Sequence, residues 1–350
     1  MPSPASKPVS RARRILVRVA LFLFAAALFF VFGFVPWFLV DRVVVKGFTL
    51  PDRENTEYVN TEFKKIPHED IELHASDGVK VSGWWAPVAN PRGTVVLVHG
   101  LNRTRIEMAT KVEPLTAWGF NCILIDLRHH GASGPHATTF GATEQLDVRA
   151  AVDFALAKAP GLPVVLWGVS LGGATVTLEA ASDSRVGGVI VDSAYDSLPG
   201  TVRHHLRLAR GFRFRGIPIL KVVPQWPTAD IVLFWMKRRG GFDPETVDIL
   251  GAAARLKDRP TLFVANRGDV RIPHEIGAEM SRLAGPKSRM VLTEVNGHGK
   301  AWREARSLYE PAVKALLDEV APPLSATDAS KVPASGAASP RPSSSERTRQ

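Results

Sequence analysis

The sequence predicts an α/β fold: a mostly parallel central sheet with helices on both faces, a helical insertion, and one transmembrane helix before it. Short apolar runs alternate with longer segments of helical spacing, and this alternation requires crossover connections between parallel strands. One apolar run leads into a Gly-x-Ser-x-Gly turn followed by a helix-compatible segment. Residues 19–40 contain no charged side chain. These three observations predict the architecture.

Composition limits the class of protein. The chain has 350 residues, of which 45% are hydrophobic, enough for one large domain. The formal net charge of +10 suits an anionic membrane surface or a nucleic acid, but the charge lies next to an apolar segment and no nucleic-acid-binding module is present. The single cysteine, Cys122, lies in an apolar run and is expected to be a buried thiol. No glycine-rich phosphate loop, HExxH or cysteine pair occurs, so we expect no nucleotide or metal cofactor.

The uncharged stretch 19–40 is long enough to cross a bilayer and too long for the apolar part of a cleavable signal peptide. It therefore predicts an uncleaved signal-anchor. Residues 1–18 carry five cations and no acid, which favours a cytoplasmic N-terminus and a body on the outer side of the cell (inner) membrane. Residues 41–62 are interpreted as a juxtamembrane connector. Residues 321–350, rich in Pro, Ser and Ala, predict a disordered tail.

The body, residues 63–320, begins with two alternating segments around the turn Ser76-Asp77-Gly78, which predicts a β-hairpin over 71–75 and 79–85. Short runs of Val, Leu and Ile then predict strands buried on both faces, as in parallel sheets. Helical spacing separates these runs, and Asp147 is expected on the solvated face of its helix. The expected strands are 93–98, 121–127, 164–167, 189–191, 261–265 and 290–295, and the expected helices are 107–118, 143–157, 276–283 and 301–320.

The alternation is interrupted by residues 197–250, which we interpret as a helical lid. Basic side chains here are interleaved with aromatic ones, including Phe212, Phe214 and Trp226. Two interpretations remain open. The segment is an ordinary amphipathic lid with a solvated cationic face, or it lies on anionic headgroups and admits lipid-like acyl substrates. The remaining basic positions are Arg203, Arg207, Arg210, Arg213, Arg215, Lys221, Lys237, Arg238 and Arg239.

The turn around Ser170 is the strongest sign of chemistry. Apolar residues precede it and a helix-compatible segment follows, so the sequence predicts a strand, a sharp turn and a helix. Such a turn strains its central residue and packs helix against strand too closely for a Cβ, which explains Gly168 and Gly172. Ser170 would stand at the tip, where its hydroxyl can act as a nucleophile if a base lies within reach.

Base and acid are expected at the same edge of the sheet, because the carboxyl ends of parallel strands meet there. His298, in a glycine-flanked loop after the last expected strand, fits the base. Asp269 follows the preceding expected strand and is the favoured acid, with Asp192 as the alternative. An oxyanion would need backbone N–H donors, and Leu171 and Leu101 are the candidates.

Together these segments resemble the α/β-hydrolase superfamily over Phe63 to Val320, and the hairpin resembles the serine aminopeptidase and acylglycerol-lipase-like group. The resemblance implies a Ser170, Asp269, His298 triad in a serine hydrolase that cleaves ester, thioester or amide bonds through an acyl-enzyme. A small-molecule or lipid-like acyl substrate is expected, and nothing indicates an oligomeric state. A peptidase of the same fold and a catalytically silent binding or scaffold module are the alternatives. The motifs are residues 97–100, 126–133, 168–173, 268–269 and 297–298, with Asp77-Gly78 and Gly83-Trp84-Trp85 in the hairpin.

Overall fold

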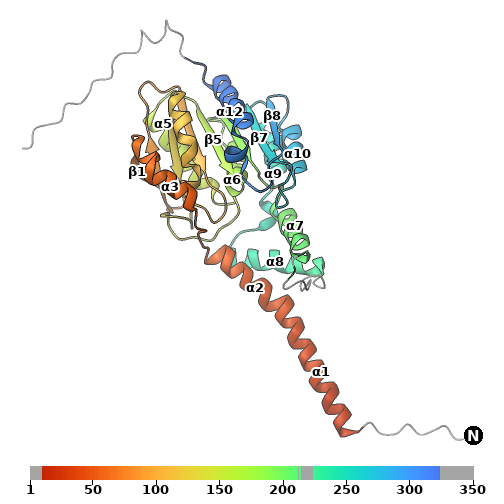
Figure 1. The fold of residues 1–350 in the computed structure, drawn as a ribbon. Coiled ribbons are helices and arrows are strands. Elements are labelled where there is room, and N and C mark those ends of the chain that lie inside the picture. The colour runs from red at the N-terminus through yellow and green to blue at the C-terminus, as the bar shows by residue number, and fades with distance from the viewer. Residues whose placement is uncertain (1–9, 212, 214–223, 324–350) are drawn as a thin grey trace, which may run out of the picture.

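A computed structural model describes residues 10–211, 213 and 224–323, and its centre is an eight-stranded sheet flanked by helices (Figure 1). The strands lie in the order β1-β2-β4-β3-β5-β6-β7-β8. β1 pairs antiparallel with β2 and β2 with β4, whereas every pair from β4 to β8 is parallel. The predicted α/β class and mostly parallel sheet are confirmed.

Burial follows the apolar patterns. Every residue of β3 (Gly93–Val98), β4 (Phe120–Ile125), β5 (Val164–Val169) and β7 (Thr261–Asn266) is buried, because helices cover both faces of these strands. The remaining strands are β1 (Glu69–His74), β2 (Lys80–Ala86), β6 (Val186–Asp192) and β8 (Ser288–Thr293), and β1 and β8 form the more exposed edges.

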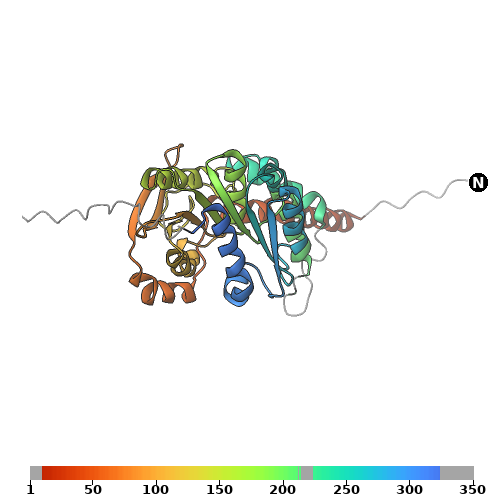
Figure 2. The same cartoon turned by 90° about the horizontal axis from the view of Figure 1, so that it is seen from above.

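Two helical layers sandwich the sheet (Figure 2). One face packs against α5 (Gln145–Lys158), α6 (Leu171–Ser182), α9 (Ile249–Ala253) and α10 (His274–Ala284). The other packs against α4 (Val112–Ala117), α11 (Ala301–Glu304) and α12 (Arg306–Val320). The parallel strands consequently present their carboxyl ends along one edge, between the two layers.

Several predicted boundaries were wrong. The helix expected over 107–118 is a 3₁₀ segment, η4 (Arg105–Lys111), followed by α4, because Pro114 lacks the N–H that would continue α-helical bonding to residue 110. The closing helix is divided at Ala305, and β8 ends at Thr293. The connector holds helix α3 (Arg53–Thr61), which begins at the capping side chain of Asp52 and is followed by the short segment η3 (Phe63–Lys65).

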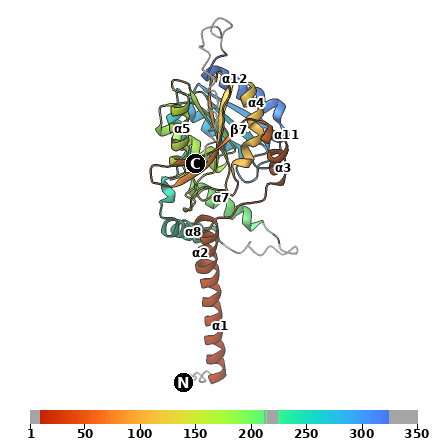
Figure 3. The same cartoon turned by 90° about the vertical axis from the view of Figure 1, so that its left-hand side faces the viewer.

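The N-terminal segment is one long helical rod that projects from the body (Figures 1 and 3). It comprises α1 (Arg11–Phe29), η1 (Phe30–Phe34), α2 (Val35–Val40) and η2 (Asp41–Val45), so it extends beyond the predicted 19–40 at both ends. Its most apolar 18-residue window has a mean hydropathy of 2.7 and none of that window is buried. By length and composition the rod is a candidate for a membrane span.

The insertion contains α7 (Leu198–Arg210), α8 (Gln225–Gly240) and the short 3₁₀ segment η5 (Pro244–Thr246). A β-bridge between Ser197 and Asp248 joins its two ends. Helix α8 packs against α2 and η2, where the rod joins the body, and Figure 3 shows α8 beside α2 at this junction. Phe212, Phe214, Arg215, Lys221 and residues 324–350 of the expected disordered tail lie outside the described residues.

Candidate active site

Ser170 lies in the sharp turn between β5 and α6. Its backbone has φ 55° and ψ −114°, a strained conformation for a residue with a side chain. Its N–H donates to the Asp192 carbonyl at 2.8 Å, which fixes the turn against β6. A Cβ on Gly172 would meet the Val98 carbonyl oxygen at 2.2 Å, and one on Gly168 would meet the Gly172 carbonyl carbon and oxygen at the same distance. The two glycines are therefore required for the close approach of α6 to the strands.

The structure brings Ser170, His298 and Asp269 together from three distant segments. The Ser170 hydroxyl oxygen lies 2.8 Å from His298 Nε2. The other ring nitrogen, Nδ1, lies 2.7 Å from Asp269 Oδ2. With the proton on Nδ1, that nitrogen donates to the carboxylate and Nε2 accepts from the serine hydroxyl. This is the arrangement in which an imidazole can remove the serine proton.

The Asp269 carboxylate is buried and fully bonded. Its second oxygen, Oδ1, accepts hydrogen bonds from the backbone N–H groups of Arg271 at 2.9 Å and Ile272 at 3.1 Å. Burial alone would raise the pKa of Asp269, but the hydrogen bond and charge of His298 and the two backbone donors outweigh it and lower the pKa. The carboxylate is therefore ionised and held in one orientation towards the imidazole.

The alternative acid, Asp192, makes no hydrogen bond to His298. It is the last residue of β6 and fully buried, and its Oδ1 accepts a hydrogen bond from the Ser193 hydroxyl at 2.8 Å. Burial raises its pKa. Asp192 instead contributes its backbone carbonyl, which holds the N–H of Ser170.

Leu101 lies in the loop after β3, beside Ser170, and Leu171 directly follows Ser170 in the chain. Leu171 is the first residue of α6, so its N–H precedes the first intrahelical hydrogen bond. Within the part of the chain that the structure describes, no backbone carbonyl accepts a hydrogen bond from the Leu101 N–H. Both donors remain available to an oxyanion. The groups that hold the Leu101 loop were not predicted from the sequence. Glu107 Oε2 accepts from the Gly100 N–H at 2.7 Å, and His130 Nε2 accepts from the Asn102 N–H at 3.1 Å.

Two buried histidines stiffen the loops behind the site. His99 Nε2 accepts from the Leu127 N–H at 3.0 Å, so it joins the end of β3 to the loop after β4. Burial lowers the pKa of His99 to about 3, and burial also lowers that of His130. Both rings are therefore neutral at physiological pH, as acceptors of backbone hydrogen bonds must be.

Asp147 was expected on a solvated surface, and this prediction was wrong. Its carboxylate is fully buried and accepts hydrogen bonds from both the backbone and the guanidinium of Arg128. The same guanidinium also binds Asp77 in the β1–β2 turn at 2.6 Å. Arg128 therefore joins the hairpin, the loop after β4 and helix α5, and its role is structural.

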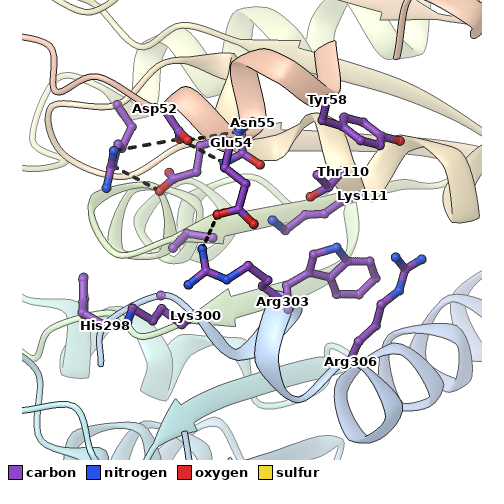
Figure 4. Close-up of a pocket in the computed structure, with 15 residues that line it drawn as sticks. Asp52, Glu54, Asn55, Tyr58, Thr110, Lys111, His298, Lys300, Arg303 and Arg306 are labelled. Carbon is purple, nitrogen blue, oxygen red and sulfur yellow. Dashed lines mark hydrogen bonds and ion pairs between the residues drawn. The ribbon is translucent and has the colours of Figure 1, made fainter. Parts of the chain in front are cut away.

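A cavity of about 390 Å³ opens beside His298, between α3 and η4 on one side and α11 on the other (Figure 4). His298 and Val169 lie in its wall, so it adjoins the serine turn. Its remaining lining is mostly charged, and Figure 4 shows the α3 side chains facing Lys300, Arg303 and Arg306 across it. Within residues 10–211, 213 and 224–323, no three His, Cys, Asp or Glu side chains are grouped so that they could hold a metal ion.

Comparison with known proteins agrees with this geometry. Residues 89–238 match the family described as serine aminopeptidase, S33, and residues 243–327 match a family of TAP-like proteins within the abhydrolases. The uncharacterized protein YqkD of Bacillus subtilis is 23% identical over 284 residues, which cover 80% of this chain and 88% of YqkD. The quorum-quenching protein AidA of Acinetobacter baumannii is 35% identical over 130 residues, which cover 35% of this chain and 42% of AidA.

Solved structures share the fold. The esterase Pf2001 of Pyrococcus furiosus superposes with a TM-score of 0.62 at 20% identity, covering 79% of this chain and 98% of the esterase. The acylaminoacyl peptidase of Pyrococcus horikoshii superposes with a TM-score of 0.52 at 14% identity, covering 78% of this chain and 45% of the peptidase. The sheet order, the strained serine turn and the two family matches lead to one conclusion: this chain has the α/β-hydrolase fold.

Proposed function

We propose that this protein is a membrane-anchored serine hydrolase that cleaves carboxylic esters through an acyl-enzyme. The observation that carries the proposal is the hydrogen-bonded series from the Ser170 hydroxyl through His298 to Asp269, with both distances below 3 Å. A serine hydroxyl is a weak nucleophile unless a base takes its proton and a third group orients that base. In this series His298 is the base and Asp269 is the orienting acid.

The reaction would proceed in two halves. Ser170 Oγ bonds to the substrate carbonyl carbon while its proton passes to His298 Nε2, and the oxyanion accepts hydrogen bonds from the Leu101 and Leu171 N–H groups. The imidazolium then donates its proton to the leaving alkoxide as the ester C–O bond breaks. In the second half a water molecule gives its proton to His298 Nε2 as its oxygen bonds to the acyl carbon. The imidazolium then returns a proton to Ser170 Oγ as the acyl C–Oγ bond breaks, which releases the carboxylic acid and the free serine. Asp269 stays ionised throughout and stabilises the imidazolium.

An ester is the favoured substrate, and a peptide is the second candidate. Esterases of this fold, such as Pf2001, support the first. The family match described as serine aminopeptidase supports the second. Both activities would use the same three residues, so the preferred leaving group, an alcohol or an amine, distinguishes an esterase from a peptidase.

A substrate panel tests the proposal. The full-length protein in detergent micelles is assayed on p-nitrophenyl esters of graded acyl length and on aminoacyl p-nitroanilides, with Ser170→Ala as control. We expect ester turnover that the Ser170→Ala variant loses. Preference for the anilides would favour the peptidase. Failure of the wild-type protein to cleave either class would contradict the hydrolase and favour a binding or scaffold role.

The membrane anchor rests on how the rod joins the body. Val40 and Val44, in its last turns, are buried, and Arg239 of α8 donates a hydrogen bond to the buried side chain of Asp41. The end of the rod is thus part of the folded body. Because cleavage would remove these buried contacts, they favour an uncleaved membrane anchor over a signal peptide that is cleaved off. Leu208, Trp226 and Phe234 are exposed on α7 and α8, as expected of a lid that contacts lipid and admits acyl substrates.

Membrane orientation has a separate test. Protease added to intact spheroplasts should digest the body if the positive N-terminus is cytoplasmic and the body lies outside the inner membrane. Digestion only after lysis would place the body in the cytoplasm and contradict the orientation.

A further inference from the structure

One lysine in the wall of the cavity beside His298 has no carboxylate partner among the residues that the structure describes. Lys111, at the end of η4, is only 4% exposed and lines the cavity. Its ammonium lies 5.6 Å from the centre of the Trp167 ring and 5.8 Å from that of Trp302. Within residues 10–211, 213 and 224–323, no carboxylate lies within 4.0 Å of this ammonium and no protein acceptor receives a hydrogen bond from it. Buried ammonium groups are costly unless an anion or acceptor completes them.

The other cations of the wall are already paired. Five cationic and three acidic side chains line the cavity. Arg303 binds Glu54 of α3 at 2.6 Å, and Arg103 lies 3.7 Å from Glu107. Arg306 pairs with Glu310, and Lys300 with Glu304 at 3.8 Å. Lys111 is therefore a cation of the cavity wall that forms no ion pair with a carboxylate of the described residues.

A second donor points to the same kind of ligand. The indole N–H of Trp302 is buried without a hydrogen-bond partner, and Trp302 lines the same cavity. Lys111 and Trp302 contribute donors and no acceptor. Burial lowers the pKa of Lys111, and the charges of Glu107 and Asp192 offset this only in part. A bound anion would supply the missing acceptors and favour the charged form of the lysine.

We propose that this cavity binds the anionic group of the substrate, a carboxylate or a phosphate, through Lys111 and the Trp302 N–H. The inference rests on the proposed function, since His298 shares the cavity wall and an anion held there belongs to a molecule that reaches the serine turn. The volume of about 390 Å³ accommodates a small polar group of this kind. The substrate class is thus an acyl ester that carries a negative charge near its reacting carbonyl, and Lys111 is a binding residue for that charge.

Calorimetry on the full-length Ser170→Ala protein in detergent micelles tests this directly, because binding is measured without turnover. Two matched probe pairs are titrated: the monoamide of glutaric acid against neutral glutaramide, and glycerol 3-phosphate against glycerol. We expect at least one anion to bind about tenfold or more tightly than its neutral analogue, and the better anion identifies the carboxylate or the phosphate as the preferred group.

Lys111→Met, added to Ser170→Ala, keeps the aliphatic contact with both indoles and removes the charge. It should abolish the preference for the anion, whereas Lys257→Met, which removes an exposed lysine elsewhere, should retain it. Trp302→Phe keeps an aromatic ring but removes the indole N–H, and it should weaken anion binding by a smaller factor. It therefore tests the site even if Lys111→Met does not fold. Equal binding of anions and neutral analogues, or an anion preference unchanged by both cavity variants, would overturn the proposal.

Calorimetry combined with fluorophosphonate labelling of Ser170 distinguishes failure of this inference from failure of the proposed function. Wild-type protein that reacts with a fluorophosphonate at Ser170 but shows no anion preference after the Ser170→Ala change would leave the hydrolase standing and remove the anion site. Anion binding that depends on Lys111, in a protein whose wild-type form does not react, would preserve the binding site and remove the catalytic role.

Discussion

Replacing Asp269 by Asn tests the orienting role of this residue most sharply. The backbone N–H groups of Arg271 and Ile272 both donate to Oδ1, so the amide oxygen of an Asn must occupy that position. Its NH₂ group then replaces Oδ2, which lies 2.7 Å from His298 Nδ1. A donor facing Nδ1 favours the tautomer with the proton on Nε2, and that nitrogen can no longer accept the Ser170 proton.

The expected loss is large. A base in the wrong tautomer lowers kcat by about 10⁴-fold, equivalent to about 5.5 kcal/mol of transition-state stabilisation. The assay is steady-state hydrolysis of a p-nitrophenyl ester, with kcat and KM determined separately. We expect the effect in kcat, because Asp269 is buried and acts through His298.

Asp192→Asn is the matched control, since it makes the same chemical change at the alternative acid. Burial already raises the pKa of Asp192, and its carboxylate does not contact His298, so we expect kcat within about tenfold of wild type. An Asp269→Asn variant that keeps more than a tenth of wild-type kcat, or an Asp192→Asn variant that loses as much, would refute the assignment of the acid.

Three further predictions concern the groups around the site. Glu107→Ala removes the acceptor of the Gly100 N–H and should lower kcat about 10- to 100-fold with little change in KM. Glu107→Gln keeps an acceptor, so its kcat should stay close to that of the wild type. Equal kinetics for the two variants would contradict a role of Glu107 in holding the Leu101 loop. Arg128→Met leaves two carboxylates without their partner and should cost about 3–5 kcal/mol in thermal or denaturant unfolding. Arg282→Met, which breaks an exposed ion pair with Glu279, should cost far less, and similar losses for the two variants would refute the structural role of Arg128. Burial lowers the pKa of His99 to about 3, so the ring stays neutral in the folded protein, while the unfolded chain takes up a proton below about pH 6.5. His99 should therefore lower the free energy of unfolding by up to about 1.4 kcal/mol per pH unit as the pH falls from about 6.5 towards 3. His99→Gln should flatten this slope in denaturant titrations at several pH values, and an unchanged slope would contradict the assignment.

The sheet could be predicted from the sequence because its signals are local. Runs such as 93–98 and 164–169 are apolar over the length of one strand, and strands buried on both faces need little else. The turn at Ser170 could be predicted for the same reason. Gly168 and Gly172 are required because a Cβ at either position would clash with atoms a few residues away or on the adjacent strand.

Other features depend on pairings that no local pattern records. Asp147 carries the spacing of a surface residue, and only its partner Arg128, in the loop after β4, explains its burial. Glu107 and Lys111 look like ordinary polar residues of a helix until η4 is folded against the serine turn. The cavity needs α3 and α11 side by side, although the two helices are about 250 residues apart in the chain, as the contact of Glu54 with Arg303 illustrates.

The central claim is that Ser170 is a nucleophile activated by His298. Full-length protein is treated with a fluorophosphonate, digested, and examined by mass spectrometry to locate the adduct. We expect the label on the peptide that contains Ser170, its absence in Ser170→Ala, and much slower labelling in His298→Ala. Label on a different residue, or none on folded wild-type protein, would contradict the account.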